Sequence, residues 1–157
     1  MIDMHAHWRP AELADALRER TREPRIVRNQ DGVEVLKTRM GEEPLAHAFD
    51  HVDTYLARMD RQGVSMSVLS LLGTACWIES QPLEVSLPLC RLVNDSLSRI
   101  CQEHPGRFTA HAALPLADIS AAAALVNSVS ASSFRSGGAA RTRPTPSIQS
   151  SPANCGS

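Results

Sequence analysis

The stretch Ile2-Asp3-Met4-His5-Ala6-His7, close to the amino terminus, decides how the rest of the chain is interpreted. Its apolar and polar residues alternate, which is typical of a β-strand with one apolar face. In such a strand Asp3, His5 and His7 project from the same face. Two imidazoles side by side can reach a single zinc ion, which binds nitrogen at about 2.0 to 2.1 Å. We therefore predict that His5 and His7 bind a metal.

The spacing of these residues leaves alternatives open. Asp3 would either hold a ligand imidazole in one tautomer or accept a hydrogen bond from a neighbouring strand. A His-x-His pair also occurs by chance and in surface turns. Its place at the carboxyl end of a strand that opens a series of strands and helices favours a metal site, because α/β barrels carry their catalytic residues there.

Strand and helix patterns alternate from this stretch to about residue 125. Helices are predicted at residues 10–22, 53–62, 87–104 and from Asp118 onward, and strands at 64–72 and 108–114. Asp53 is expected to cap the second helix and Gly63 to end it. Asp31-Gly32 lies between two short apolar runs and predicts a β-hairpin insert at about residues 25–38. The alternation predicts an α/β fold with three parallel strands joined by right-handed crossovers.

Length and composition exclude several classes of protein. With 157 residues, 43% of them hydrophobic and 21% charged, the chain has the size and composition of one soluble domain. Its longest apolar stretch, residues 64–78, is shorter than the ~20 residues that cross a bilayer, and the amino terminus lacks a secretory pattern. A formal net charge of -1 gives no basic field that would attract nucleic acid or anionic lipid. We therefore expect a cytoplasmic protein that binds a small molecule.

Residues 126–157 differ in composition from the rest of the chain. All 17 acidic residues lie at or before Asp118, whereas Arg135, Arg141 and Arg143 follow it. The last 32 residues contain nine serines and few large apolar side chains. Such a segment buries too little apolar surface to offset its ordering entropy. We predict a domain of residues 1–125 followed by a disordered, low-complexity tail.

Three blocks of residues occur in a specific order within residues 1 to about 125. They are Ile2-Asp3-Met4-His5-Ala6-His7 with Pro10; Tyr55-Leu56-Ala57-Arg58-Met59-Asp60-Arg61-Gln62-Gly63-Val64 with Ser67-Val68-Leu69-Ser70; and Val93-Asn94-Asp95 with His104-Pro105-Gly106-Arg107-Phe108 and Ala113-Leu114-Pro115-Leu116-Ala117-Asp118. Together they resemble amidohydrolase family 2, the metal-dependent TIM-barrel group that includes aminocarboxymuconate semialdehyde decarboxylase. The resemblance implies about three βα units, the N-terminal portion of a TIM (β/α)8 barrel, which in full needs eight strands and ~250 residues.

The resemblance also implies a metal and a reaction class. In that family a divalent metal, usually zinc, is bound by two histidines of the first strand, a third histidine further along and an aspartate near the eighth strand. His5 and His7 match the first two, and Asp3 matches the acid before them by position. A metal-activated water would hydrolyse a small carboxylated or aromatic metabolite, or hydrate a double bond before decarboxylation. Because the two later ligands have no counterpart, we expect a weak or absent metal site and no activity.

The resemblance stops abruptly within the helix that contains residue 125. Residues from about 126 onward are therefore either a native flexible tail or the product of a reading-frame shift in a gene of high GC content. Two functions stay open. The chain is a truncated hydrolase or decarboxylase, or it is a non-enzymatic βα fragment that binds a partner chain, forms a homo-oligomer or aggregates through its open sheet edge.

Other polar residues have weaker patterns. Trp77 would line a substrate pocket or pack on a neighbouring helix, and His111 would face a barrel interior or lie satisfied in the core. His47 and His51 have the spacing of helical metal ligands but are expected in a solvated loop. His104 ends a helix and is expected to act as a cap. Four basic residues of the insert would receive a substrate carboxylate or face water: Arg25, Arg28, Lys37 and Arg39.

Overall fold

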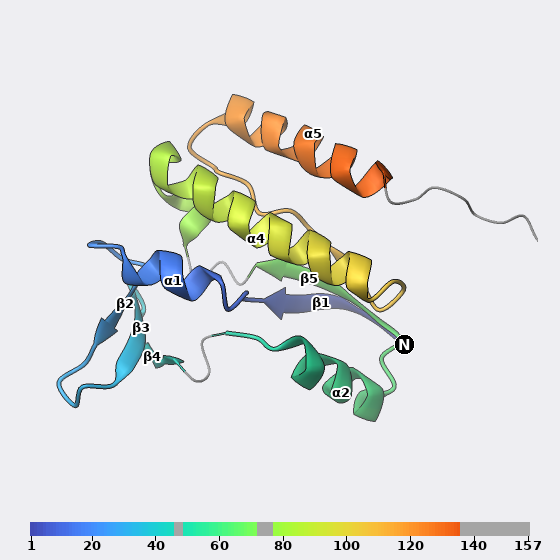
Figure 1. The fold of residues 1–157 in the computed structure, drawn as a ribbon, viewed down its shortest axis with the longest axis horizontal. Coiled ribbons are helices and arrows are strands. Elements are labelled where there is room, and N and C mark those ends of the chain that lie inside the picture. Colours follow the sequence, from blue (N-terminus) through green and yellow to red (C-terminus); the bar gives the residue numbers. More distant parts are fainter. Residues whose placement is uncertain (46–48, 72–76, 136–157) are drawn as a thin grey trace, which may run out of the picture.

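The computed structural model describes the backbone of residues 1–45, 49–71 and 77–135, and side chains as far as residue 128. Its elements are β1 (Ile2–Trp8), α1 (Leu13–Arg18), β2 (Arg25–Arg28), β3 (Glu34–Thr38), β4 (Gly41–Pro44), α2 (Val52–Gln62), β5 (Met66–Leu71), the 3-10 turn η2 (Ile78–Ser80), α4 (Leu83–Glu103), β6 (Phe108–Ala110) and α5 (Ile119–Arg135). Figure 1 shows β1 beside β5, with α4 and α5 running next to each other along the sheet. None of the described helices is long and apolar enough to cross a membrane.

The main sheet is parallel, as the alternation of strands and helices predicts. Its strand order is β1-β5-β6, and both neighbouring pairs run parallel. The insert and α2 connect β1 to β5, and α4 connects β5 to β6, so the chain forms two consecutive βαβ units. This arrangement confirms the predicted α/β class and its three parallel strands.

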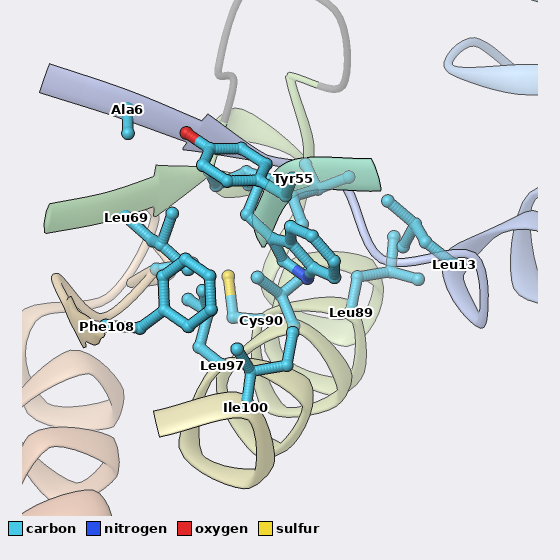
Figure 2. Packing of buried hydrophobic residues seen from close by; sticks show 14 of the residues in the cluster. Ala6, Leu13, Tyr55, Leu69, Leu89, Cys90, Leu97, Ile100 and Phe108 are labelled. Carbon is cyan, nitrogen blue, oxygen red and sulfur yellow. The ribbon is translucent and has the colours of Figure 1, made fainter. Parts of the chain in front are cut away.

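Apolar side chains from one face of this sheet form the core together with the helices. Ala6, Trp8 and Leu69 line that face and are at most 4% exposed. Tyr55 of α2 packs edge-on against Trp8 and Phe108, with ring centroids 6.2 and 5.8 Å apart. The buried apolar residues of α4 recur at helical spacing and are Leu89, Cys90, Val93, Leu97 and Ile100. Figure 2 shows residues of both layers meeting between the sheet and α4, where each large buried side chain stabilises the fold by about 1.5–3 kcal/mol.

A buried amide joins α4 to the segment that follows β6. Asn94 is 3% exposed, donates from Nδ2 to the Ala113 carbonyl at 2.9 Å and accepts the Ala113 N–H at 2.8 Å. These two bonds satisfy the backbone of Ala113 in the place of a strand partner, because β6 ends at Ala110 and not at the predicted residue 114. The Asn94 amide thus makes the backbone hydrogen bonds that a neighbouring strand would make if β6 were longer.

The predicted hairpin insert is a three-stranded antiparallel sheet. β2 and β3 pair around Asp31-Gly32 as expected, and β4 adds a strand that the pattern analysis missed. The β4 sequence, GEEP, has no apolar alternation, which is common for a short edge strand. Arg18 of α1 holds the insert with a two-point ion pair to Glu34, at 3.2 and 3.0 Å.

Two helices begin away from their predicted limits. α1 covers six residues within the predicted 10–22, because the polar run after Arg18 offers no further apolar contact to the core. α2 has His51 at its N-cap position, so Asp53 lies in the first helical turn and is not the cap. There its carboxylate still faces the positive end of the helix dipole. Gly63 ends α2 in the left-handed conformation, as predicted.

The helix predicted at residues 87–104 begins four residues earlier. α4 starts at Leu83, and Pro88 lies inside it. Val85 and Ser86 donate their N–H groups to the Pro82 carbonyl at 2.9 Å, which closes a helical turn ahead of the proline. The start predicted beside Pro88 is therefore wrong, because proline is tolerated near the first turns when the preceding turn closes by itself.

α5 runs past the boundary predicted at residue 125. The Asp118 carboxylate accepts the Ala121 N–H at 2.9 Å and caps the helix, as expected from the sequence. Leu125 is 5% exposed and packs in the core, and the helix extends to Arg135. Residues 136–157 lie outside the described part of the chain, so the flexible-tail and frame-shift interpretations remain predictions there.

Candidate metal centre

His5 and His7 lie toward the carboxyl end of β1 with their ring nitrogens turned to each other. The two Nε2 atoms are 3.1 Å apart, and the rings meet edge to face with centroids 4.7 Å apart. Two nitrogen ligands held 2.0–2.1 Å from one ion at a tetrahedral angle are about 3.3 Å apart. The strand therefore holds both imidazoles close to the geometry that a shared divalent cation requires.

The Ser70 hydroxyl of β5 lies beside the His7 ring. Its hydroxyl donates to the Ala6 carbonyl at 3.3 Å and lies 3.5 Å from Nδ1 of His7. In the tautomer with a proton on Nδ1, His7 would donate to this hydroxyl and keep a lone pair on Nε2. The sequence analysis assigned no role to Ser70. Its position became clear only from the register of β1 and β5, in which Ser70 pairs with His7.

A β-bulge in β1 places Asp3 on the other face of the sheet from His7. Asp3 pairs with Ser67 and His7 pairs with Ser70, so β1 uses one residue more than β5 between these pairs. Ser67 and Ser70 face opposite sides, because they are three residues apart in an alternating strand. Burial raises the pKa of the Tyr55 phenol, the Arg58 charge opposes that rise and the Asp3 charge adds to it.

The expectation that Asp3, His5 and His7 share one face is therefore wrong. The alternation rule holds only for a strand without a bulge, and the bulge leaves no trace in the residue pattern. The Asp3 carboxylate accepts the backbone N–H of His5 at 3.1 Å, so this contact is with the main chain of a ligand residue and not with its ring. A role for Asp3 beside the metal stays a prediction.

His111 follows β6 on the same face of the sheet as His7. Its N–H donates to the Leu69 carbonyl at 2.8 Å, which continues the β5–β6 ladder past Ala110. This register sets His111 across from Ser70, which is itself across from His7. The three polar residues form one row across the three strands, and the His111 side chain is exposed. The orientation of His111 toward a barrel interior stays a prediction.

Trp77 contacts the insert. The Arg39 guanidinium stacks on its ring, with Cζ 3.1 Å from the ring centroid, in a cation–π contact. Trp77 has a left-handed φ of 47°, and its Nε1 is buried without a hydrogen-bond partner among the described residues. Ser80 and Gln81 donate from their side chains to its carbonyl, both at 3.2 Å. The sequence analysis predicted that Trp77 lines a substrate pocket or packs on a neighbouring helix, and it did not predict the contact with Arg39.

Three of the four basic residues of the insert have partners within the protein. Arg39 stacks on Trp77, Lys37 lies 3.7 Å from a Glu42 carboxylate oxygen, and Arg28 donates to the Gly32 carbonyl at 2.9 Å. These contacts favour the prediction that the charged side chains of the insert bind within the insert or face water, and do not receive a substrate carboxylate.

Two of the other described histidines, His51 and His104, lie away from the pair. His104 is the C-cap residue of α4, as predicted, and its ring packs edge-on against Phe108 at 6.0 Å. His51 precedes α2 and is exposed, and His47 lies outside the described residues. Within residues 1–45, 49–71 and 77–135, no three His, Cys, Asp or Glu side chains gather into a metal site. The described part of the chain therefore offers a two-ligand centre.

Comparison with known proteins shows related decarboxylases. No family model matches the sequence. It is 39% identical to the gamma-resorcylate decarboxylase of Rhizobium radiobacter over 74 residues, which are 46% of this chain and 22% of that protein. The crystal structure of 5-carboxyvanillate decarboxylase from Sphingomonas paucimobilis matches 82% of this chain and 38% of that one, with 26% identity and a TM-score of 0.61.

Two further solved structures, at lower identity, show the fold alone. The apo form of Metarhizium anisopliae IDCase has a TM-score of 0.67 and 23% identity, over 81% of this chain and 38% of that one. A dihydroxybenzoic acid decarboxylase from Polaromonas sp. JS666, solved with bound manganese and the inhibitor 2-nitroresorcinol, has a TM-score of 0.53 and 20% identity, over 80% and 33% of the two chains.

These findings confirm the resemblance that the three sequence blocks predict. The chain is related to amidohydrolase-type decarboxylases, and its α/β fold matches TIM-barrel chains of that kind over part of their length. It spans about a fifth of the curated relative and less than two fifths of each of these solved chains.

Proposed function

We propose that His5 and His7 provide two metal ligands of a decarboxylase that acts on a small aromatic carboxylate. The 3.1 Å distance between the two Nε2 atoms carries this proposal, because two nitrogen ligands of one tetrahedral ion lie at about that separation. The sequence similarity to gamma-resorcylate decarboxylase supports the substrate class. A divalent metal on imidazole nitrogens, for which zinc is well suited, would polarise the oxygen atoms of the substrate.

The protein's own residues near the pair would orient the substrate and hold protons. Ser70 would favour the His7 tautomer that leaves Nε2 free, and His111 lies in the same row, where it would hydrogen-bond to the substrate or exchange a proton with it. Trp77 belongs to the segment that follows β5, so it extends from the same carboxyl edge of the sheet as His7 and His111. We propose it as a wall of the substrate site, with Arg39 supporting its ring.

The two-ligand centre predicts weak metal binding by this chain and no turnover on its own. Zinc in proteins takes four ligands at structural sites and three at catalytic ones, and the described residues offer two. Hydrolysis of a small metabolite by the same centre is the alternative reaction. We propose the cytoplasm as the location, with no nucleic acid or membrane as partner.

Metal titration of histidine variants tests the ligand assignment. We expect Zn²⁺ or Mn²⁺ to bind the wild-type chain in isothermal titration calorimetry, and His5→Ala or His7→Ala to weaken binding at least tenfold. His51→Ala is the matched control, because His51 is exposed and its side chain makes no cap hydrogen bond. Equal affinity in all four proteins would show that the metal, if any, binds elsewhere.

A chimera tests the reaction. Residues 1–71 of this chain would replace the matching part of the Rhizobium radiobacter gamma-resorcylate decarboxylase, and release of CO₂ from gamma-resorcylate would be measured. We expect activity that is lost with His5→Ala or His7→Ala and kept with His51→Ala. A folded chimera, with native circular dichroism and bound metal, that releases no CO₂ would contradict the decarboxylase proposal.

A further inference from the structure

The 3-10 turn η2 contacts three segments that follow strands of the main sheet. The segment after β1 contains the insert, η2 itself lies in the segment after β5, and the segment after β6 begins at His111. In a parallel sheet these segments leave the same carboxyl edge, where α/β barrels carry their functional residues. We propose that η2 is a junction that fixes the three segments, and that Glu79 is a positioning residue that holds Trp77 and His111 in a fixed relation. This inference rests on the proposed function, in which Trp77 and His111 contact the substrate.

The backbone of Trp77 adopts a conformation that its surroundings must hold. Its φ of 47° lies in the left-handed region, which no other non-glycine residue of the described part of the chain occupies. A residue with a Cβ is strained there and keeps that conformation only where neighbouring groups fix it, as is common at functional sites. Ser80 and Gln81 do so by donating from their side chains to the Trp77 carbonyl, both at 3.2 Å. Ile78 is 0% exposed and anchors the turn in the core.

Two arginines of the segment after β1 bind the insert to this turn. The Arg39 guanidinium stacks on the Trp77 ring, with Cζ 3.1 Å from the ring centroid. The Arg20 guanidinium donates to Oε1 of Gln81 at 3.3 Å and to the Pro24 carbonyl, directly before the insert, at 2.7 Å. One guanidinium therefore holds the ring of Trp77, and the other holds the side chain that binds the carbonyl of Trp77.

Glu79 binds the segment after β6 at two points. Its Oε1 accepts the Leu114 N–H at 3.2 Å, and its backbone carbonyl accepts the Leu116 N–H at 2.8 Å. His111 lies three residues before Leu114, and its own N–H donates to a carbonyl of β5 at 2.8 Å. The segment that carries His111 is thus held by β5 at one end and by Glu79 at the other. Because Glu79 is only two residues from Trp77, one short turn sets the position of both side chains.

Fluorine NMR of the full 157-residue chain, labelled with 5-fluorotryptophan, tests the junction. The chain has two tryptophans, so we expect two resonances, and Trp77→Phe identifies the one from Trp77. Glu79→Ala removes the carboxylate that binds Leu114 and should shift or broaden the Trp77 resonance, while that of Trp8 stays in place. Glu79→Gln keeps a side-chain oxygen that accepts the same N–H and should restore the wild-type spectrum. Glu103→Ala is the matched control, because Glu103 is exposed at the opposite end of α4.

The His111 ring reports whether a change at Trp77 reaches the segment after β6. Arg39→Ala removes the stack on Trp77 and should change the ring-nitrogen shifts of His111 in a long-range proton–nitrogen spectrum. Arg39 is exposed, so this variant should keep the fold even if Glu79→Ala does not, and far-ultraviolet circular dichroism checks each variant. A changed Trp77 resonance with unchanged His111 shifts in Arg39→Ala would overturn the junction. An unchanged Trp77 resonance in folded Glu79→Ala would overturn it as well.

These spectra need neither metal nor substrate, so they separate the junction from the proposed reaction. In the chimera described above, extended to residues 1–118 of this chain, Glu79→Ala should lower kcat/KM for gamma-resorcylate about tenfold, because small displacements of substrate-positioning groups are costly. Glu79→Gln and Glu103→Ala should not lower it. An unchanged kcat/KM in Glu79→Ala would overturn the positioning role. A folded, metal-loaded chimera that releases no CO₂ would instead overturn the proposed function, and with it the role of Glu79 toward a substrate.

Discussion

One extra residue in β1 separates the candidate ligands His5 and His7 from the acid that precedes them. In the sequence Asp3, His5 and His7 alternate without interruption, and the pair His5 and His7 obeys that alternation in the structure. The bulge before Ala6 turns Asp3 to the face where Tyr55 lies. Residue types at short range therefore predicted that His5 and His7 lie together, but the face of Asp3 depended on the partner strand.

The Cys90 thiol gives a prediction at the scale of a single residue. Burial raises its pKa to about 12 from the ordinary value of 9.0. Because the folded-state pKa is higher, the unfolded chain loses this proton first as the pH rises. The contribution to the free energy of unfolding is fully present below pH 9 and is lost progressively between pH 9 and about 12. Urea unfolding at pH 8 and pH 10.5, with reductant present, should therefore show lower stability at the higher pH.

Cys90→Ala separates this effect from other groups that titrate in the same range. The variant keeps a small apolar residue at a position that is 0% exposed, and it has no thiol to ionise. Its stability should fall less between the two pH values than that of the wild type. Parallel losses in both proteins would mean that the Cys90 thiol is not responsible.

At the scale of elements, the sequence located helices and strands better than it located their ends. Gly63 marked the end of α2 because a left-handed C-cap favours glycine, and its φ is 67°. The starts of α2 and α4 were displaced because their first turns close through backbone bonds that involve no preferred capping side chain. The short strands β4 and β6 depend on pairing rather than on their own pattern.

Gly63 gives the prediction at this scale. Gly63→Ala should lower the free energy of unfolding by about 1 kcal/mol, because a residue with a Cβ is strained at positive φ. No atom lies within 4 Å of the added Cβ position, so the effect comes from the backbone alone. Gly63→Asn should cost less, since asparagine tolerates the left-handed region. Urea unfolding measures both variants, and equal stability of all three proteins would refute the left-handed cap.

At the scale of the whole molecule, α5 packs against α4 and adds Leu125 to the hydrophobic core. Leu125 is 5% exposed and belongs to the core, whereas Ile119 at the start of the same helix is 87% exposed. α5 therefore contributes a buried face through Leu125, although its composition becomes rich in serine from this point.

A pair of substitutions in α5 tests this packing. Leu125→Ala should lower the free energy of unfolding by about 2–5 kcal/mol, as is usual when a core leucine leaves a cavity. Ile119→Ala removes a similar side chain from the exposed face of the helix and should change stability by no more than about 0.5 kcal/mol. Urea unfolding followed by circular dichroism compares them, and equal losses would contradict the packing of α5 against α4.

Sequence alone determined the α/β class, the order of elements from β1 to α5, the glycine that ends α2 and the candidate ligands His5 and His7. Each of these follows from residues close together in the chain, whose spacing sets their face or their turn. Tertiary structure decided the rest: the position of Asp3, the contact of Ser70 with His7, the row that includes His111 and the stack of Arg39 on Trp77. These depend on how strands far apart in sequence align, and a shift of one residue in that register turns a side chain to the other face.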